Sequence, residues 1–92
     1  MKNLDIEERG RLIRDIHEAL NQGSLTLGQA VSRLRQEVTG LSQAKFAKLC
    51  KLSERSLLQL EQDAGNPTIK SLNKVMRPFG LTVGIVAINR TL

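Results

Sequence analysis

Aromatic residues are nearly absent from this sequence of 92 residues. Phe46 and Phe79 are its two phenylalanines, and it contains neither tryptophan nor tyrosine. Proteins that bind single-stranded nucleic acid or RNA loops usually stack the bases on aromatic side chains. The scarcity of aromatic residues therefore argues against both of these functions.

Residues that commonly carry catalysis or bind metals are scarce as well. The chain has one cysteine, Cys50, and one histidine, His17, and it lacks a glycine-rich phosphate loop. A single cysteine cannot form an intramolecular disulfide, and no metal ligand or base stands near it at a useful spacing. We interpret Cys50 as a small core residue and expect His17 to be exposed or half-buried. The sequence predicts neither an enzyme nor a bound metal or cofactor.

Long apolar runs are also missing. No stretch approaches the roughly 20 apolar residues of a membrane-spanning helix. The N-terminus, MKNLDIEERG, is too polar and too charged for a signal peptide. The length is that of one domain. From these features we expect a soluble, cytoplasmic protein with no membrane partner.

Basic residues are plentiful, and they are concentrated in one region. The 14 Lys and Arg residues outnumber the 9 Asp and Glu residues. Residues 1–40 carry six of each sign, whereas residues 41–77 carry seven basic and three acidic residues. Such a region can bind a polyanion, but it can equally be a solvated, lysine-rich surface. Charge alone leaves both interpretations open.

Apolar residues recur at helical spacing in five segments of the chain. We expect helices over residues 4–21, 27–38, 42–50, 53–62 and from 68 to about 79, where Pro78 and Gly80 stop the last one. The expected N-caps of the second to fifth helices are Thr26 or Ser24, Ser42, Ser53 and Thr68. The side chains expected to face inward include Ile6, Ile13, Ile16, Leu20, Ala30, Val31, Leu34, Val38, Phe46, Ala47, Leu49 or Cys50, Leu52, Leu57, Leu60, Ile69, Leu72, Val75, Met76 and Phe79.

The last apolar run, LTVGIVAI at residues 81–88, is rich in β-branched residues and fits a strand better than a helix. It is the single strand that the sequence predicts, and one strand leaves its backbone hydrogen-bonding groups unpaired. The simplest remedy is pairing with the same strand of a second copy across a two-fold axis. We therefore expect a homodimer, and the residues expected to hold it are Leu81, Val83, Ile85, Val86 and Ile88.

A very short turn joins the third and fourth expected helices. Two helices joined in this way form a helix-turn-helix, whose second helix presents its N-terminal residues to the major groove of DNA. On that helix Arg55 can bond guanine, Gln59 can bond adenine and Glu54 can accept from cytosine. The helix N-termini at Ser42 and Ser53 aim free backbone amides at phosphates.

The stretch LSQAKFAKLCKLSERSLLQLEQDAGNPTIKSLNKVMRPFGL resembles the Xre/Cro-type helix-turn-helix family, which includes the lambdoid phage repressors. The resemblance covers roughly residues 26–81 and implies a mainly α, five-helix lambda-repressor-like fold. Lys51 stands where the family usually has glycine; a non-glycine residue can take the left-handed conformation at some cost, and a slightly reshaped turn is the alternative. The matching positions are Leu41, Ser42, Gln43, Phe46, Ala47, Ser53, Glu61, Asn66 and Pro67.

The resemblance also implies roles for individual residues. Glu54, Arg55 and Gln59 match the base-reading positions of the family. Leu58 stands at a usually polar position, where it meets a thymine methyl group or covers its neighbours. The residues implied to contact phosphate are Ser42, Gln43, Ser53, Ser56, Gln62, Asn66 and Lys70.

An Xre-type domain followed by a short apolar strand is similar to HipB-type antitoxins, whose dimer represses its own operon and binds a HipA-like kinase toxin. This similarity divides the chain into an accessory helix (1–22), a DNA-binding domain (23–80) and a dimerisation strand (81–92). The function that it implies is an autoregulating repressor that binds a double-stranded palindromic operator, associated with the bacterial nucleoid when bound. Two alternatives stay open: an Xre-type regulator without a toxin partner, and a protein-interaction module that keeps the fold and does not bind DNA.

Overall fold

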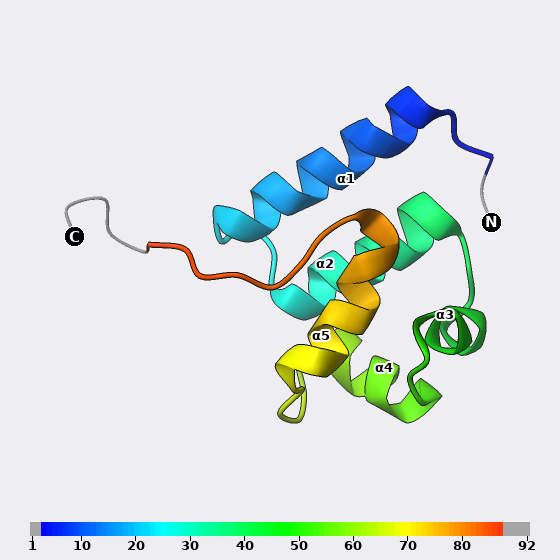
Figure 1. Cartoon of the computed structure of the whole chain (residues 1–92), viewed down its shortest axis with the longest axis vertical. Coiled ribbons are helices and arrows are strands. Elements are labelled where there is room, and N and C mark those ends of the chain that lie inside the picture. Colours follow the sequence, from blue (N-terminus) through cyan, green and yellow to red (C-terminus); the bar gives the residue numbers. More distant parts are fainter. Residues whose placement is uncertain (1–2, 88–92) are drawn as a thin grey trace.

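The structure, a computed structural model, describes residues 3–87 of the chain. This part contains five α-helices and two shorter helical segments (Figure 1). The segment η1 continues α2 as a π-helix, and η2 continues α5 as a single 3-10 turn. None of these helices has the length and apolar character that a membrane crossing requires. The elements are α1 (Ile6–Asn21), α2 (Leu27–Arg33), η1 (Leu34–Thr39), α3 (Gln43–Cys50), α4 (Glu54–Glu61), α5 (Ile69–Met76) and η2 (Arg77–Phe79).

Short polar side chains set the beginning of every α-helix. Each N-cap side chain accepts a hydrogen bond from the backbone N–H three residues further on, which satisfies a donor that the helix itself cannot pair. At Thr26 the bond is reciprocated, because the Gln29 side chain accepts from the Thr26 backbone N–H. The caps at Thr26, Ser42, Ser53 and Thr68 confirm the predicted ones, and Asp5 caps α1. The backbone hydrogen bond from Glu8 lowers the pKa of the Asp5 carboxyl below its ordinary value.

One hydrophobic core lies between the helices. Most of the predicted inward-facing residues are in it, and the buried apolar residues are Ile16, Ala30, Val31, Leu34, Val38, Phe46, Ala47, Cys50, Leu57, Leu60, Val75, Met76 and Phe79. The predictions for Ile6 and Ile69 are wrong, because these side chains are 90% and 66% exposed. Each is the first residue of its helix, and because helical side chains lean toward the N-terminus, these two extend beyond the end of the helix. Leu49 is also exposed, and Cys50 takes the inward position beside it.

The sequence predicted an α-helix that continues to Val38, but α2 ends at Arg33. From Leu34 the chain forms the wider turn of η1, and the Gly40 N–H donates to the Arg35 carbonyl five residues earlier. Wider turns of this kind inside helices are rare and occur frequently at functional sites. Here the turn places the polar residues Arg35 and Thr39 in buried positions.

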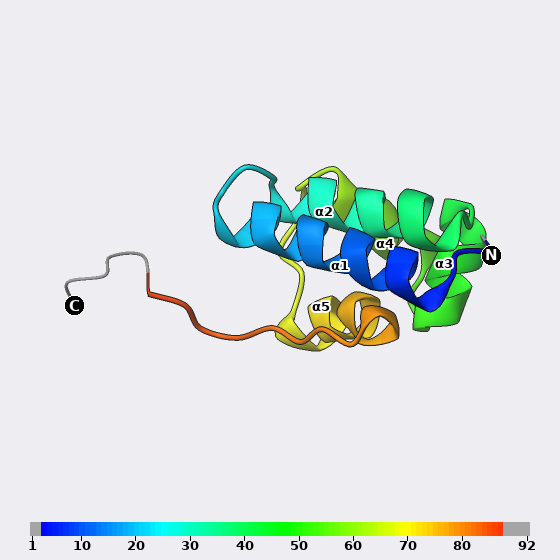
Figure 2. The ribbon, with the colours of Figure 1, turned by 90° about the horizontal axis from the view of Figure 1, so that it is seen from above.

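The two ends of the described chain are attached to the body differently. Helix α1 lies along one edge of the molecule, where Arg9 Nη2 donates to the Pro78 carbonyl at 2.9 Å and the guanidinium lies 6.0 Å from the centroid of the Phe79 ring (Figures 1 and 2). At the other end, the Asn73 side-chain oxygen accepts hydrogen bonds from the Thr82 hydroxyl and the Val83 N–H. After this attachment the chain leaves the body as an isolated tail.

Residues 81–87 have no regular secondary structure in the single chain. The predicted strand is therefore not seen in its described part, and Ile88 lies outside the described residues. Val83, Ile85 and Val86 are 37%, 101% and 64% exposed. No strand is present in residues 3–80 to pair with this segment, so its backbone groups have no ladder to join.

Candidate nucleic-acid interface

Helices α3 and α4 are joined by a tight turn at Lys51. Lys51 has φ 59° and ψ 43°, so it adopts the left-handed conformation although it is not a glycine. The Leu52 N–H donates to the Ala47 carbonyl at 2.9 Å and closes the turn. Ala47 is 2% exposed, and its small side chain allows the two helices to pack closely. The two helices therefore form a helix-turn-helix, as the sequence predicted.

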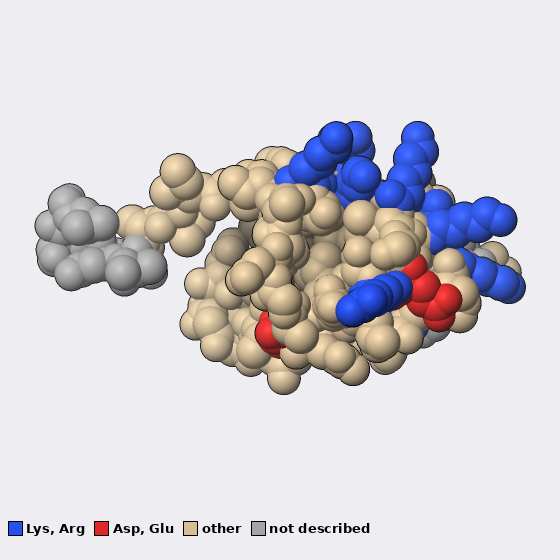
Figure 3. All heavy atoms as spheres, turned by 90° about the horizontal axis from the view of Figure 1, so that it is seen from below, with Lys and Arg blue, Asp and Glu red and all other residues tan. Residues whose placement is uncertain are grey.

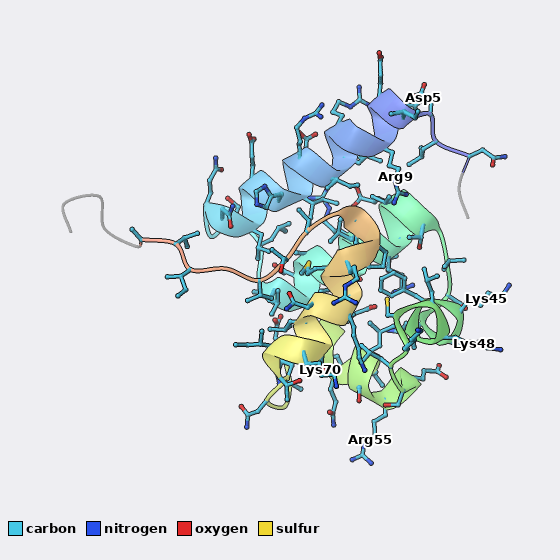
Figure 4. All side chains as sticks on the ribbon, viewed as in Figure 1. Asp5, Arg9, Lys45, Lys48, Arg55 and Lys70 are labelled. Carbon is cyan, nitrogen blue, oxygen red and sulfur yellow. The ribbon has the colours of Figure 1, made fainter. Side chains whose placement is uncertain are left out.

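Helix α4 presents polar side chains to solvent. The predicted base-reading residues Glu54, Arg55 and Gln59 are all exposed, and Arg55 points away from the body of the protein (Figure 4). Arg55 and Gln59 are four residues apart, so they lie on the same face of the helix. At the N-cap, Ser53 Oγ accepts from the Ser56 N–H and donates to Ser56 Oγ. These five side chains form one exposed polar surface that includes the capped N-terminus of the helix.

The loop between α4 and α5 lies next to this surface. A shallow pocket of about 160 Å³ brings Gln59 and Ser56 of α4 together with Asn66 of the loop. Its remaining lining residues are Leu60, Ala64, Pro67, Thr68 and Ser71. The structure thus places the predicted phosphate residue Asn66 beside a predicted base-reading residue. Gln62 and Lys70, also predicted to contact phosphate, are exposed at either end of the loop.

Gln43 differs from the other predicted contact residues because it is half-buried and already bonded. Its Nε2 donates to Oε1 of Glu61 at 3.2 Å. Glu61 in turn accepts two hydrogen bonds from Arg35, at 2.7 Å from Nε and 2.9 Å from Nη2. Arg35 Nη1 also donates to the Leu41 carbonyl just before α3. Because Glu61 can only accept while ionised, it fixes which end of the Gln43 amide faces inward.

The sequence reading did not identify this network. The side chains of Arg35 and Glu61 are 10% and 5% exposed, so the ion pair is buried. The sequence did contain one indication of a buried ion pair, because Arg35 stands four residues after Val31 on the inward face of its helix. An arginine at such a position needs a buried partner, since an unpaired charge in a core is costly.

Positive charge lies beside the exposed face of α4. The view in Figure 3 shows lysine and arginine side chains along one edge and one end of this face, with few acidic side chains between them. Glu54 is the acidic residue in the first turn of α4 itself. The basic residues of α3, the turn, α4, α5 and η2 are Lys45, Lys48, Lys51, Arg55, Lys70, Lys74 and Arg77.

Comparison with known proteins agrees with this geometry. Over 64 residues, which are 70% of this chain, the sequence is 33% identical to the HTH-type transcriptional regulator PuuR of Escherichia coli (strain K12). The comparison supports a helix-turn-helix regulator. The regulator of the same name in Shigella flexneri matches equally well, and the chain spans about a third (34%) of the length of each of these relatives. No protein-family model matches the chain. No solved structure matches it either.

Proposed function

We propose that the protein is a sequence-specific transcriptional repressor that binds double-stranded DNA. The observation that carries the proposal is the exposed polar surface at the N-terminus of α4, which combines Glu54, Arg55 and Gln59 with a capped helix end. In helix-turn-helix proteins this part of the second helix contacts base edges in the major groove. The similarity to a regulator of this type and the surrounding basic residues support the same function.

Each side chain on this surface has a distinct proposed role. Arg55 bonds guanine bidentately, because its guanidinium matches the two acceptors of that base in the major groove. Gln59 bonds adenine and Glu54 accepts from the amino group of cytosine. The proposed phosphate contacts come from the edges of the surface: Ser42, Gln43, Ser53, Ser56, Gln62, Asn66 and Lys70.

A selection from random DNA duplexes tests this proposal. The full chain should enrich a palindrome with half-sites about one helical turn apart, with an affinity that falls steeply as salt is raised. Arg55→Ala should weaken binding to the best site by about 1–3 kcal/mol and relax the preference at one base pair per half-site. Arg14→Ala, at an exposed position on α1, is the matched control. If the protein enriches no sequence, or if Arg55→Ala lowers affinity uniformly with an unchanged preferred sequence, the base-reading role is wrong.

The repressor is proposed to act as a homodimer paired through residues 81–88. The tail supports this pairing because its apolar residues Val83, Ile85 and Val86 are exposed in the single chain. Ile85→Asp should remove the association that depends on the tail, and so lower the oligomeric state in sedimentation experiments, since it puts a charge at the centre of the pairing segment. It should also weaken binding to the full palindrome much more than binding to a half-site. An oligomeric state equal to that of the unmodified chain would show that the tail does not pair.

The narrower proposal is an antitoxin of a HipBA-like operon, with a HipA-like kinase toxin as its partner. It rests on the resemblance to the Xre/Cro-type family and on the apolar tail. The gene next to the one that encodes this chain provides the test: a kinase-like product that co-purifies with the protein would support the proposal. Absence of any such gene would leave a stand-alone regulator.

One observation favours a protein-binding module that does not bind DNA. Leu58 is 39% exposed on α4, and Glu54 adds a negative charge to the same helix. Both features suit a protein partner better than they suit DNA. The selection experiment separates the two functions, because a pure interaction module would enrich no duplex.

A further inference from the structure

A large apolar side chain at the beginning of α1 is almost fully exposed to solvent. Ile6 is 90% exposed, and among the described large apolar residues Ile85 alone exceeds it. Acidic residues surround it: Asp5 is the N-cap, and Glu7 and Glu8 are exposed in the first turn. We call residues 5–8 the apex. It presents one branched apolar side chain flanked by carboxylates.

A single exposed isoleucine is ordinary in a soluble protein. This one differs because the same chain carries a groove with apolar and basic residues that complement it. The groove lies between the C-terminal end of α3 and the junction of α5 with η2, and has a volume of about 380 Å³. Its apolar residues are Leu49, Cys50 and Pro78, and its basic residues are Lys51, Lys74 and Arg77. We call these six residues the basic groove.

The basic groove fits the apex better than it fits a phosphate backbone. Leu49 is 44% exposed in the groove and gains from contact with an apolar side chain, which a phosphate does not supply. The three cations are placed to meet carboxylates on either side of such a side chain. One of them is already oriented, since Lys74 Nζ donates to the Lys51 carbonyl at 3.4 Å.

The apex and the basic groove are neighbours on the surface. Arg9, one turn after Ile6, donates to the carbonyl of Pro78, which lines the groove. The exposure of Ile6 nevertheless shows that the apex does not enter the groove of its own chain. Two neighbouring complementary patches can both be satisfied when two copies meet across a two-fold axis, because each apex then enters the groove of the other copy.

We propose that the apex of one copy docks in the basic groove of a second copy, and that the two copies do so reciprocally. This contact is separate from the proposed tail pairing, because the tail leaves the body at the opposite end from the apex (Figures 1 and 4). Both contacts can therefore form at once. A chain with both would link its tail-paired dimers to one another, and dimers on neighbouring DNA sites would bind cooperatively.

A charge-reversal experiment tests the docking without disturbing the core. All variants are made in the full chain carrying Ile85→Asp, so that tail pairing does not contribute. Lys74→Glu with Arg77→Glu turns the groove from net positive to net negative, and Glu7→Lys with Glu8→Lys turns the apex from net negative to net positive. Each of these two proteins should fail to self-associate in sedimentation velocity, because like charges then face each other. When they are mixed, they should form a heterodimer, since each apex then meets a groove of opposite charge.

A second pair of variants tests the apolar contact. Ile6→Asp should weaken self-association by about tenfold or more, as expected when an interface loses one buried isoleucine side chain. Ile69→Asp, which changes another exposed isoleucine at the start of a helix, is the matched control and should leave association unchanged. Circular dichroism of every variant confirms that it is folded.

Two results would overturn the docking proposal. One is a mixture of the charge-reversed proteins that stays monomeric. The other is a loss of DNA affinity in the Lys74→Glu, Arg77→Glu protein with no change in self-association, which would assign the basic groove to the phosphate backbone. Neither result bears on base reading by α4, because that is tested separately through Arg55.

Discussion

Removing one partner of the buried ion pair between Arg35 and Glu61 should lower the free energy of unfolding strongly, whereas replacing both partners by apolar residues should change it little. Arg35→Met alone leaves the Glu61 carboxylate, 5% exposed, without its main partner. Breaking a buried pair in this way costs about 3–5 kcal/mol. That is a large part of the 5–15 kcal/mol that typically separates folded from unfolded domains. We expect Arg35→Met to unfold at a much lower denaturant concentration than the unmodified chain.

Removing both charges should restore most of this loss. In Arg35→Met combined with Glu61→Leu, two apolar side chains of similar volume fill the site and no buried charge is left. Replacements of this kind are often neutral or stabilising. The matched control is Arg33→Met. Arg33 pairs with Glu37 on the surface, where the two side chains are 39% and 36% exposed, so this change should cost at most about 1 kcal/mol.

Guanidinium denaturation followed by circular dichroism measures these three stabilities. The reasoning fails if Arg35→Met costs no more than Arg33→Met, or if the double variant is as unstable as Arg35→Met. Binding to DNA supplies a second measurement. Because Glu61 holds the Gln43 amide, Gln43→Ala should weaken binding in the unmodified chain and add little in the double variant, a coupling of about 0.5–3 kcal/mol.

Two further substitutions and one labelling experiment have defined outcomes. Gly28→Ala should lower the free energy of unfolding by about 1–3 kcal/mol, because the new Cβ would lie 2.6 Å from the Glu61 carbonyl oxygen. Gly84→Ala is the control: its Cβ would meet nothing within 4 Å, so it should be neutral in the same denaturation assay. Lys51→Gly should stabilise the fold by about 1 kcal/mol, since it relieves a left-handed conformation at φ 59°. Burial raises the pKa of the Cys50 thiol to about 11, so iodoacetamide should alkylate it far more slowly in folded than in unfolded protein at a pH of about 8. Equal alkylation rates would show that Cys50 is accessible.

Local rules predicted most of the helices in this chain. The four predicted N-caps are correct because a serine or threonine before an apolar period satisfies the first backbone donors whatever the rest of the chain does. The core was also largely predictable, since periodicity identifies the face of a helix that packs inward. The apolar periodicity of a helix does not show how far the surface on which the helix packs extends. For this reason Ile6 and Ile69 have the inward phase of their helices and still lie in solvent.

The π-helical turn η1 could not be read from the sequence. Val31, Leu34 and Val38 fit an ordinary α-helix as well as they fit the observed structure. In the wider turn Arg35 bonds to Glu61, which lies 26 residues further along the chain, and apolar periodicity carries no information on such a tertiary contact. The exposed face of α4 was predictable from spacing alone. The hydrogen bond of Gln43 to Glu61 was not, since it joins residues 18 positions apart.

These long-range contacts also explain why α4 is suited to present side chains to a partner. Its C-terminal end is fixed to α2 and η1 at two places. Asp63, two residues after the helix, accepts from the Gly28 N–H at 2.7 Å, and Glu61 pairs with Arg35. The N-terminal end, which carries Arg55, is exposed. A helix held rigidly at one end and exposed at the other loses little conformational freedom when a partner binds, so the core already sets the orientation in which α4 presents its side chains.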